Sequence, residues 1–126
     1  MEQKVTKKRV LVIEDDFGIR LILSEKLKDI GIDVITSETG LNAVYKIKTE
    51  MPDLVLLDIM LPGGMNGFDV LEQVKADEKV KNIPVIIMTN LDTEQKTAMS
   101  IGAVDYIVKT NISFDDVVLK IQKLLK

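Results

Sequence analysis

Short apolar runs alternate with stretches of helical periodicity along the whole chain. The apolar runs are rich in valine, isoleucine and leucine and are too short for buried helices, which indicates strands. In the segments between them, apolar residues recur every three or four positions, the spacing of one helix face. The pattern predicts strands over 9–13, 33–36, 54–57, 84–88 and 106–108, and helices over 17–30, 41–51, 67–76, 92–101 and 114–125.

Polar residues and glycines mark the predicted helix ends. Asp16 and Ser113 precede helical segments and are typical N-caps. Asp92 and Gln95 have the spacing of a capping box, which places a helix start at 92. Gly102 follows the same helix and predicts its end.

Five strands and five helices in alternation predict an α/β fold. The strands are apolar on both faces, as expected of a parallel sheet covered by helices on each side. A closed barrel needs eight such units, so we expect an open doubly wound sheet of the flavodoxin-like type. The length of 126 residues predicts one domain over 1–126, with residues 1–8 as a flexible N-terminal tail.

Composition excludes several classes of site and partner. The chain has 20 acids and 17 bases, a balance that argues against direct nucleic-acid binding. It has no cysteine or histidine, which excludes thiolate zinc sites, cysteine nucleophiles and imidazole bases. No apolar run approaches the ~18 residues of a membrane span. We therefore expect a cytoplasmic protein without membrane insertion.

Chemically active side chains follow the predicted strands at the edge where open α/β sheets bind ligands. Glu14 and Asp15 follow the first strand, Asp58 the third, Thr89 the fourth and Lys109 the fifth. Clustered carboxylates repel one another unless a cation lies among them, and Mg²⁺ suits oxygen ligands of this kind. A carboxylate such as Asp58 can then act as a nucleophile toward phosphorus.

Several segments, in order along the chain, resemble motifs of one family. They are Val12–Asp16, Leu56–Pro62, Gly67, Met88–Thr89, Gly102–Ala103 and Tyr106–Lys109. The sequence is similar to the receiver domains of two-component response regulators, of the single-domain, chemotaxis-regulator-like type. The resemblance covers the chain from about Arg9 to Leu125 and implies the sheet order 2-1-3-4-5, in which the strands before Asp15 and Asp58 are neighbours.

The resemblance implies a magnesium-dependent phosphoprotein in a phosphorelay. Asp58 would be the phosphoacceptor that forms an aspartyl phosphate. Asp15 and Asp58 would bind Mg²⁺ directly, Glu14 mostly through water, and Met60 through its backbone carbonyl. The implied donor is a phosphohistidine of a sensor histidine kinase or of a histidine phosphotransfer protein.

The resemblance also implies how the signal is read. Thr89 and Lys109 would bind the phosphoryl group, and Thr89 and Tyr106 would form the switch, in which the aromatic ring turns inward. The fourth helix, fifth strand and fifth helix would then contact a downstream target protein. We expect a monomer or a phosphorylation-dependent dimer, and a regulatory domain rather than an enzyme, which at most promotes its own phosphorylation and dephosphorylation.

Three positions depart from the family pattern. Thr110 replaces the usual proline after Lys109, so we expect a trans bond there, because a non-proline cis bond costs ~3 kcal/mol. The loop after Asp58 is one residue longer than the common form and contains Gly63–Gly64. Asn90 is larger than the small residue that commonly follows the threonine.

Other functions stay open on the residues alone. A phosphatase with an aspartate nucleophile needs a second aspartate where this chain has Met60, and a flavodoxin-like cofactor site would face repulsion from Glu14 and Asp15. A receiver-like interaction module that works without phosphorylation fits the same residues. No output domain follows Leu125, so we expect either docking to a separate target or an excised receiver.

Overall fold

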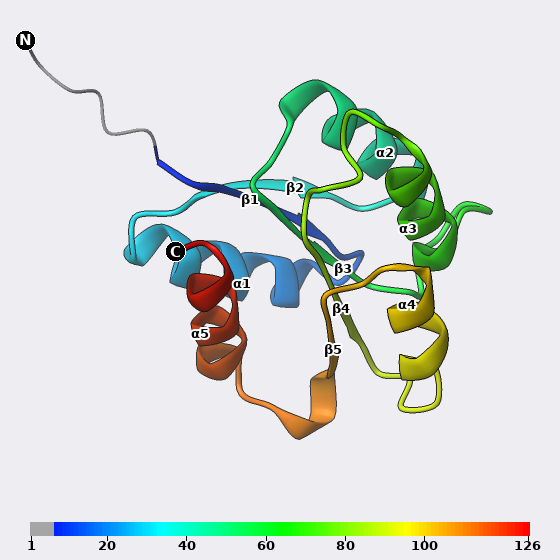
Figure 1. Cartoon of the computed structure of the whole chain (residues 1–126). Coiled ribbons are helices and arrows are strands. Elements are labelled where there is room, and N and C mark those ends of the chain that lie inside the picture. The colour runs from blue at the N-terminus through cyan, green and yellow to red at the C-terminus, as the bar shows by residue number, and fades with distance from the viewer. Residues whose placement is uncertain (1–6) are drawn as a thin grey trace, which may run out of the picture.

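Residues 7–126 are described by a computed structural model, in which the apolar runs form one parallel sheet (Figure 1). The strands are β1 (Arg9–Ile13), β2 (Asp33–Ser37), β3 (Leu54–Leu57), β4 (Val85–Thr89) and β5 (Asp105–Val108). The helices are α1 (Phe17–Asp29), α2 (Gly40–Glu50), α3 (Gly67–Ala76), α4 (Gln95–Ile101) and α5 (Phe114–Leu124), with a 3-10 turn, η1 (Lys109–Asn111), before α5. All ten predicted elements are present.

The N-terminal tail expected over residues 1–8 falls mostly outside the described residues. Within the described part, the carbonyl of Lys8 accepts a hydrogen bond from the Asp33 N–H at 2.9 Å. Lys8 is therefore attached to the start of β2.

The strand order is β2-β1-β3-β4-β5, which confirms the predicted fold class and topology. Ile13, the last residue of β1, is paired with Ser37 of β2 and with Leu57 of β3. The hydrogen bonding continues one step further, because the N–H of Asp58 donates to the Ile13 carbonyl at 3.1 Å. The residues that follow β1 and β3 therefore leave the sheet side by side.

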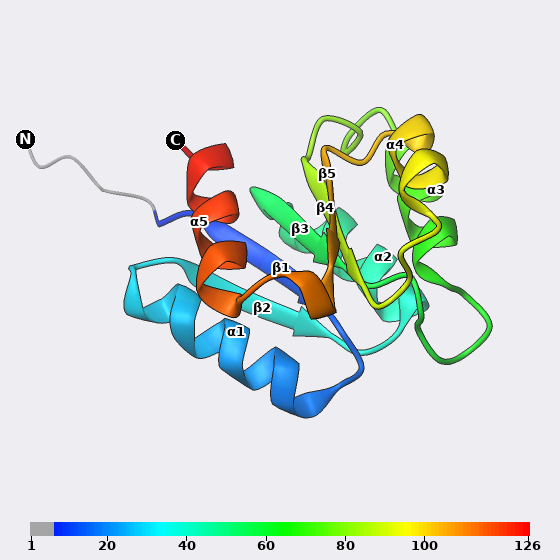
Figure 2. The same cartoon turned by 90° about the horizontal axis from the view of Figure 1, so that it is seen from below.

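Helices cover both faces of the sheet. Figures 1 and 2 show α1 and α5 on one face and α2, α3 and α4 on the other. Along β1, Leu11 and Ile13 belong to the core under α2–α4, whereas Val10 and Val12 belong to the core under α1 and α5. This two-sided burial explains why the strands lack polar alternation. Within residues 7–126, no helix combines the length and apolarity needed to cross a membrane.

Two of the three predicted helix starts are correct. The carboxylate of Asp16 accepts the Ile19 N–H at 3.0 Å, and the Ser113 hydroxyl accepts the Asp116 N–H at 3.1 Å. The predicted capping box at 92 is wrong, because α4 begins at Gln95 after an N-cap, Glu94, that makes no side-chain capping bond.

The late start of α4 has a long-range cause. The Leu91 carbonyl accepts a hydrogen bond from the Tyr106 hydroxyl on β5, and the Leu91 N–H faces the Thr89 hydroxyl oxygen at 3.4 Å. These contacts hold the segment after β4 as a turn, so the helix forms only beyond it.

A glycine lets α3 begin directly against the end of β3. A Cβ atom at Gly67 would lie 2.2 Å from the Asp58 carbonyl oxygen and 2.6 Å from Ile59 Cα. The Gly67 N–H also donates to the Ile59 carbonyl at 2.8 Å. The backbone around Asp58 is therefore packed against α3, which restricts where the carboxylate can lie.

Candidate functional site

A cavity of about 640 Å³ opens at the carboxyl edge of the sheet. It is lined by Glu14, Asp15, Asp16, Ile19, Asp58, Ile59, Met60, Leu61, Pro62, Asn66, Asn90 and Lys109. These residues come from the segments that follow β1, β3, β4 and β5, the place where open α/β sheets bind their ligands.

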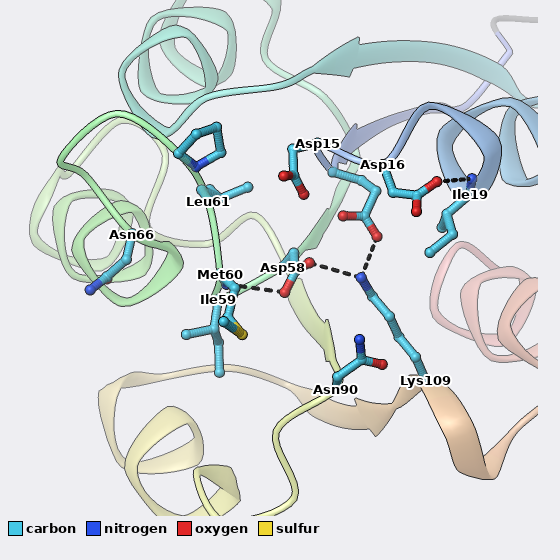
Figure 3. A pocket seen from close by; sticks show the side chains of 12 residues that line it. Asp15, Asp16, Ile19, Asp58, Ile59, Met60, Leu61, Asn66, Asn90 and Lys109 are labelled. Atoms are coloured by element: carbon cyan, nitrogen blue, oxygen red, sulfur yellow. Dashed lines mark hydrogen bonds and ion pairs between the residues drawn. The ribbon is translucent and has the colours of Figure 1, made fainter.

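Lys109 joins two buried carboxylates on the floor of this cavity. Its Nζ donates to Asp58 Oδ2 at 2.8 Å and also to Glu14 Oε1 (Figure 3). The side chains of Glu14, Asp58 and Lys109 are only 1%, 5% and 10% exposed. The ends of β1, β3 and β5 thus bring together three charged groups, of which Glu14 and Lys109 are 95 positions apart in the sequence.

Asp15 completes an acidic cluster at the more open side of the cavity. One carboxylate oxygen each from Glu14, Asp15 and Asp58 lie within 4.8 Å of one another. Figure 3 shows the Asp15 carboxylate directed toward Asp58. The predicted approach of Asp15 and Asp58 is therefore present in the structure.

Glu14 is the most buried member of this cluster. Its Oε2 atom is buried and is the one such atom without a hydrogen-bond partner within residues 7–126. Burial raises the pKa of Glu14 to about 7; the hydrogen bond from Lys109 opposes this rise, and nearby Asp58 adds to it. Burial also disfavours the charge of Lys109, but its bonds to Asp58 and Glu14 outweigh that effect and raise its pKa.

The donor set fits a small divalent cation. Three carboxylates, one with an unpartnered buried oxygen, offer the hard oxygen ligands that Mg²⁺ prefers. The backbone of Met60 lies close as well, because its N–H donates to Asp58 Oδ1 at 3.1 Å. One ammonium does not neutralise three carboxylates, so a bound cation would reduce the negative charge that remains.

Thr89 and Tyr106 lie next to the cavity rather than in it. Thr89 ends β4 and is fully buried, and the cavity lining includes the following residue, Asn90, instead. Tyr106 is 9% exposed, with its hydroxyl bonded to the Leu91 carbonyl, and burial raises its pKa. The cavity lining therefore includes Glu14, Asp15, Asp58, Met60 and Lys109. The two expected switch residues lie outside it, and each is hydrogen-bonded to the backbone of Leu91.

Two further lining residues lie outside the motif segments that were named from the sequence. Ile19 reaches the cavity from the first turn of α1, and Asn66 from the capping box that it forms with Asp69 at the start of α3. The capping pattern could have located Asn66 at a helix start, but not at the cavity. The peptide bond between Lys109 and Thr110 is trans, as predicted.

Comparisons with known proteins agree on one family. The family model described as the response regulator receiver domain matches residues 10–122. The chain is 38% identical over 106 residues to a protein of Guillardia theta described as "Probable transcriptional regulator ycf27", covering 82% of this chain and 40% of that protein. It is 36% identical over 104 residues to sporulation initiation phosphotransferase F of Bacillus subtilis, covering 80% of this chain and 81% of that protein.

Solved structures agree with the sequence relatives. The response regulator TrrA of Thermotoga maritima, solved in complex with Mg²⁺ and BeF, superposes with a TM-score of 0.82 at 34% identity, covering 94% of this chain and 99% of that chain. The chemotaxis protein CheY4 of Vibrio cholerae gives a TM-score of 0.84 at 26% identity, covering 95% of this chain and 100% of that chain. The chain spans about two fifths of the length of the transcriptional regulators that it matches.

Proposed function

Because the chain belongs to the response regulator receiver domain family, a family of regulatory domains in two-component signalling, we propose that Asp58 is its phosphoacceptor. The observation that carries the proposal is the position of this carboxylate. Asp58 is buried at the end of β3, bonded to an ammonium, and lies within 4.8 Å of two further acids. An acid in this setting is poorly explained by packing alone.

The Asp58 carboxylate is held but remains available as a nucleophile. Oδ1 accepts the Met60 N–H and Oδ2 accepts Lys109, one hydrogen bond for each oxygen. Since a carboxylate oxygen can accept about two hydrogen bonds, each keeps a free lone pair. One oxygen forms a bond to the phosphorus of a phosphohistidine as the phosphorus–nitrogen bond breaks, and the electron pair of that bond stays on the imidazole.

Lys109 stabilises the charge that this transfer brings into the cavity. Its ammonium is fixed between Glu14 and Asp58, so it lies beside the oxygens of the transferred group without reorganising. Preorganised positive charge of this kind stabilises phosphoryl oxygens in the transition state.

Glu14, Asp15, Asp58 and the Met60 carbonyl would hold Mg²⁺ as the cofactor. When bound, the ion neutralises negative charge shared by the carboxylates and the phosphoryl oxygens. The residues themselves exclude much of the surrounding water, since Glu14 and Asp58 are almost fully buried.

The readout would pass through Thr89 and Tyr106. A phosphoryl group on Asp58 offers oxygen acceptors to the Thr89 hydroxyl, which must move toward the cavity to reach them. The same hydroxyl faces the Leu91 N–H, and Leu91 is bonded to Tyr106. Movement of Thr89 therefore changes the turn before α4, and with it the surface formed by α4, β5 and α5.

Two kinds of partner in the cytoplasm are implied. One is the phosphoryl donor, a sensor histidine kinase or a histidine phosphotransfer protein, and the other is a downstream target protein. A receiver of this kind acts as a monomer or a phosphorylation-dependent dimer, and has no enzymatic turnover beyond its own phosphorylation and dephosphorylation.

Incubation with acetyl phosphate and Mg²⁺, followed by intact-mass spectrometry, tests the proposal. We expect one phosphoryl adduct on the wild type, and none with EDTA or in Asp58→Asn. Asp53→Asn is the matched control, because Asp53 lies at the opposite end of β3 and binds the Arg9 N–H. No adduct on any form contradicts the proposal and favours an interaction module that works without phosphate. An adduct that persists in Asp58→Asn also contradicts it, because another residue would then be the phosphoacceptor.

A further inference from the structure

Arg20 on α1 is bonded to the backbone of the acidic cluster. Its Nη1 donates to the carbonyl oxygen of Glu14 at 2.7 Å, and its Nη2 pairs with Glu38 Oε1 at 2.8 Å. The Arg20 side chain is only 11% exposed, whereas that of Glu38 is 65% exposed. The guanidinium thus connects the end of β1 with the loop between β2 and α2.

Asp15 lies between two carbonyl groups that Arg20 holds. The side chain of Arg20 binds the Glu14 carbonyl, and its backbone N–H donates to the Asp16 carbonyl at 3.0 Å. The Glu14 N–H is also fixed, because it donates to the Ser37 carbonyl at 3.0 Å. The orientation of the peptide group between Glu14 and Asp15 is therefore restrained from both sides.

That peptide group determines where both carboxylates point. The Glu14 and Asp15 side chains flank it, and both contribute oxygens to the cluster with Asp58. A rotation of this peptide would move the Asp15 carboxylate relative to Asp58. The Glu14 carbonyl is the acceptor through which α1 prevents that rotation.

We propose that Arg20 is a positioning residue, which orients Glu14 and Asp15 for cation binding and so for phosphorylation of Asp58. The inference rests on the proposed function. Two separate nitrogens reach two separate acceptors, a geometry that a guanidinium provides and a lysine ammonium does not. Arg20 itself contacts neither the cation nor the phosphoryl group.

The sign of the effect separates positioning from simple electrostatics. A positive charge close to the cluster repels a cation, so its removal alone would tighten Mg²⁺ binding. Removal would also free Glu38, whose negative charge attracts the cation. Weaker binding in a variant without Arg20 therefore indicates lost orientation and not lost charge.

The chain offers a matched control in its other arginine. Arg9, at the start of β1, donates to the Glu50 carbonyl at 3.3 Å and pairs with Glu50 Oε2 at 3.1 Å. It thus joins one carbonyl and one carboxylate, as Arg20 does, but at the far end of the strand. Arg9→Met removes a comparable set of bonds and leaves the cluster intact.

Isothermal titration calorimetry with Mg²⁺ alone measures the effect directly. We expect Kd to rise about tenfold or more in Arg20→Met, the usual effect of losing a group that orients ligands, and to stay within twofold in Arg9→Met. Phosphorylation by acetyl phosphate should recover in Arg20→Met when Mg²⁺ is raised to saturation. Unchanged or tighter Mg²⁺ binding in a folded Arg20→Met overturns the inference.

Arg20→Lys keeps the test valid if the methionine variant is too unstable. It preserves the charge but cannot reach both acceptors, so Kd should still rise about threefold or more, and wild-type binding would overturn the inference. The amide ¹⁵N–¹H signal of Asp15 in metal-free protein should shift in Arg20→Lys and not in Arg9→Met. If the wild type itself neither binds Mg²⁺ nor takes up phosphate, the proposed function fails. That result is distinct from failure of the inference on Arg20, in which the wild type binds Mg²⁺ and the variants bind it equally well.

Discussion

The two ends of β1 carry similar charged groups in opposite surroundings. At the amino end, Arg9 and Glu50 form a pair whose side chains are 38% and 43% exposed. At the carboxyl end, Lys109 binds Glu14 and Asp58, and none of the three is more than 10% exposed. Exposed pairs contribute little to stability because water solvates the separated charges nearly as well. Water does not solvate buried charges in the same way, so each buried charge depends on its oppositely charged partner for stabilisation.

This difference indicates which end of β1 carries the functional site. Removing charges from water is unfavourable unless partners compensate it, and a fold built for stability alone would place apolar residues there. The carboxyl end instead keeps three acids close together, two of them bonded to one ammonium, with one buried carboxylate oxygen unpartnered. Perturbed, clustered acids in a cavity are typical of functional sites.

The largest effect is expected when the buried cluster loses the ammonium of Lys109. Lys109→Met leaves Glu14 and Asp58 buried without a cation, so the free energy of unfolding at about pH 8 without Mg²⁺ should fall by about 3–5 kcal/mol. Urea unfolding followed by circular dichroism measures it. Lys120→Met, which breaks the half-exposed pair with Asp105, is the control and should lose about 1 kcal/mol or less. Equal losses in the two variants would mean that burial makes no difference.

The second prediction concerns Glu14, the acid with the unpartnered buried oxygen. The pKa of Glu14 rises from 4.5 to about 7 on folding, so the folded state binds a proton that the unfolded state has lost. Wild-type stability should therefore decline as pH rises from 4.5 to 7, by about 3 kcal/mol, since one pKa unit is about 1.4 kcal/mol. Glu14→Gln should abolish this decline and be the more stable protein at pH 8 without metal.

Urea unfolding at several pH values, in EDTA, gives the comparison. Glu50→Gln, which changes the exposed partner of Arg9 at the end of α2, should keep the wild-type decline because Glu14 is unchanged. A Glu14→Gln variant with the same pH dependence as the wild type would show that another group binds the proton.

The sequence allowed the fold and most of the acidic cluster to be predicted, for a local reason. The apolar runs that form β1 and β3 end where Glu14 and Asp58 begin, and parallel strands bring their carboxyl ends to one edge. The neighbouring position of the two strands came from the family resemblance. The apolar pattern located each acid directly after its strand, and the strand order brought the acids together. These two kinds of information were sufficient to predict the cluster.

The remaining features depend on contacts that leave no local pattern. Strand β4 includes Thr89, one residue beyond its predicted end, so Thr89 is buried within the helix-covered sheet, and Asn90, the first residue after the strand, lines the cavity. The start of α4 depends on the bond between Tyr106 and the Leu91 carbonyl. Arg20 was missed because one of its acceptors is a backbone carbonyl, which any residue could provide, and the other, Glu38, is 18 positions away in the sequence.

A third prediction concerns the pH dependence of the cation site. Mg²⁺ must displace the Glu14 proton, so with a pKa of about 7 the apparent affinity should rise roughly tenfold between pH 6 and pH 8. Calorimetric titration at these two pH values measures the rise. Glu14→Gln should bind more weakly and with almost no pH dependence. A similar rise in that variant would assign the proton to another acid.

The smallest effect is expected at the exposed end, and salt should reveal its nature. Arg9→Met should lower the free energy of unfolding by about 1 kcal/mol or less in dilute buffer, because both partners are partly solvated. At about 1 M salt, where the Debye length is only about 3 Å, most of that loss should vanish. The loss in Lys109→Met should persist in the same salt, since ions in solution screen buried charges poorly. Urea unfolding of both variants at low and high salt tests this, and a loss in Lys109→Met that also vanished would place the Glu14–Asp58–Lys109 cluster in contact with bulk water.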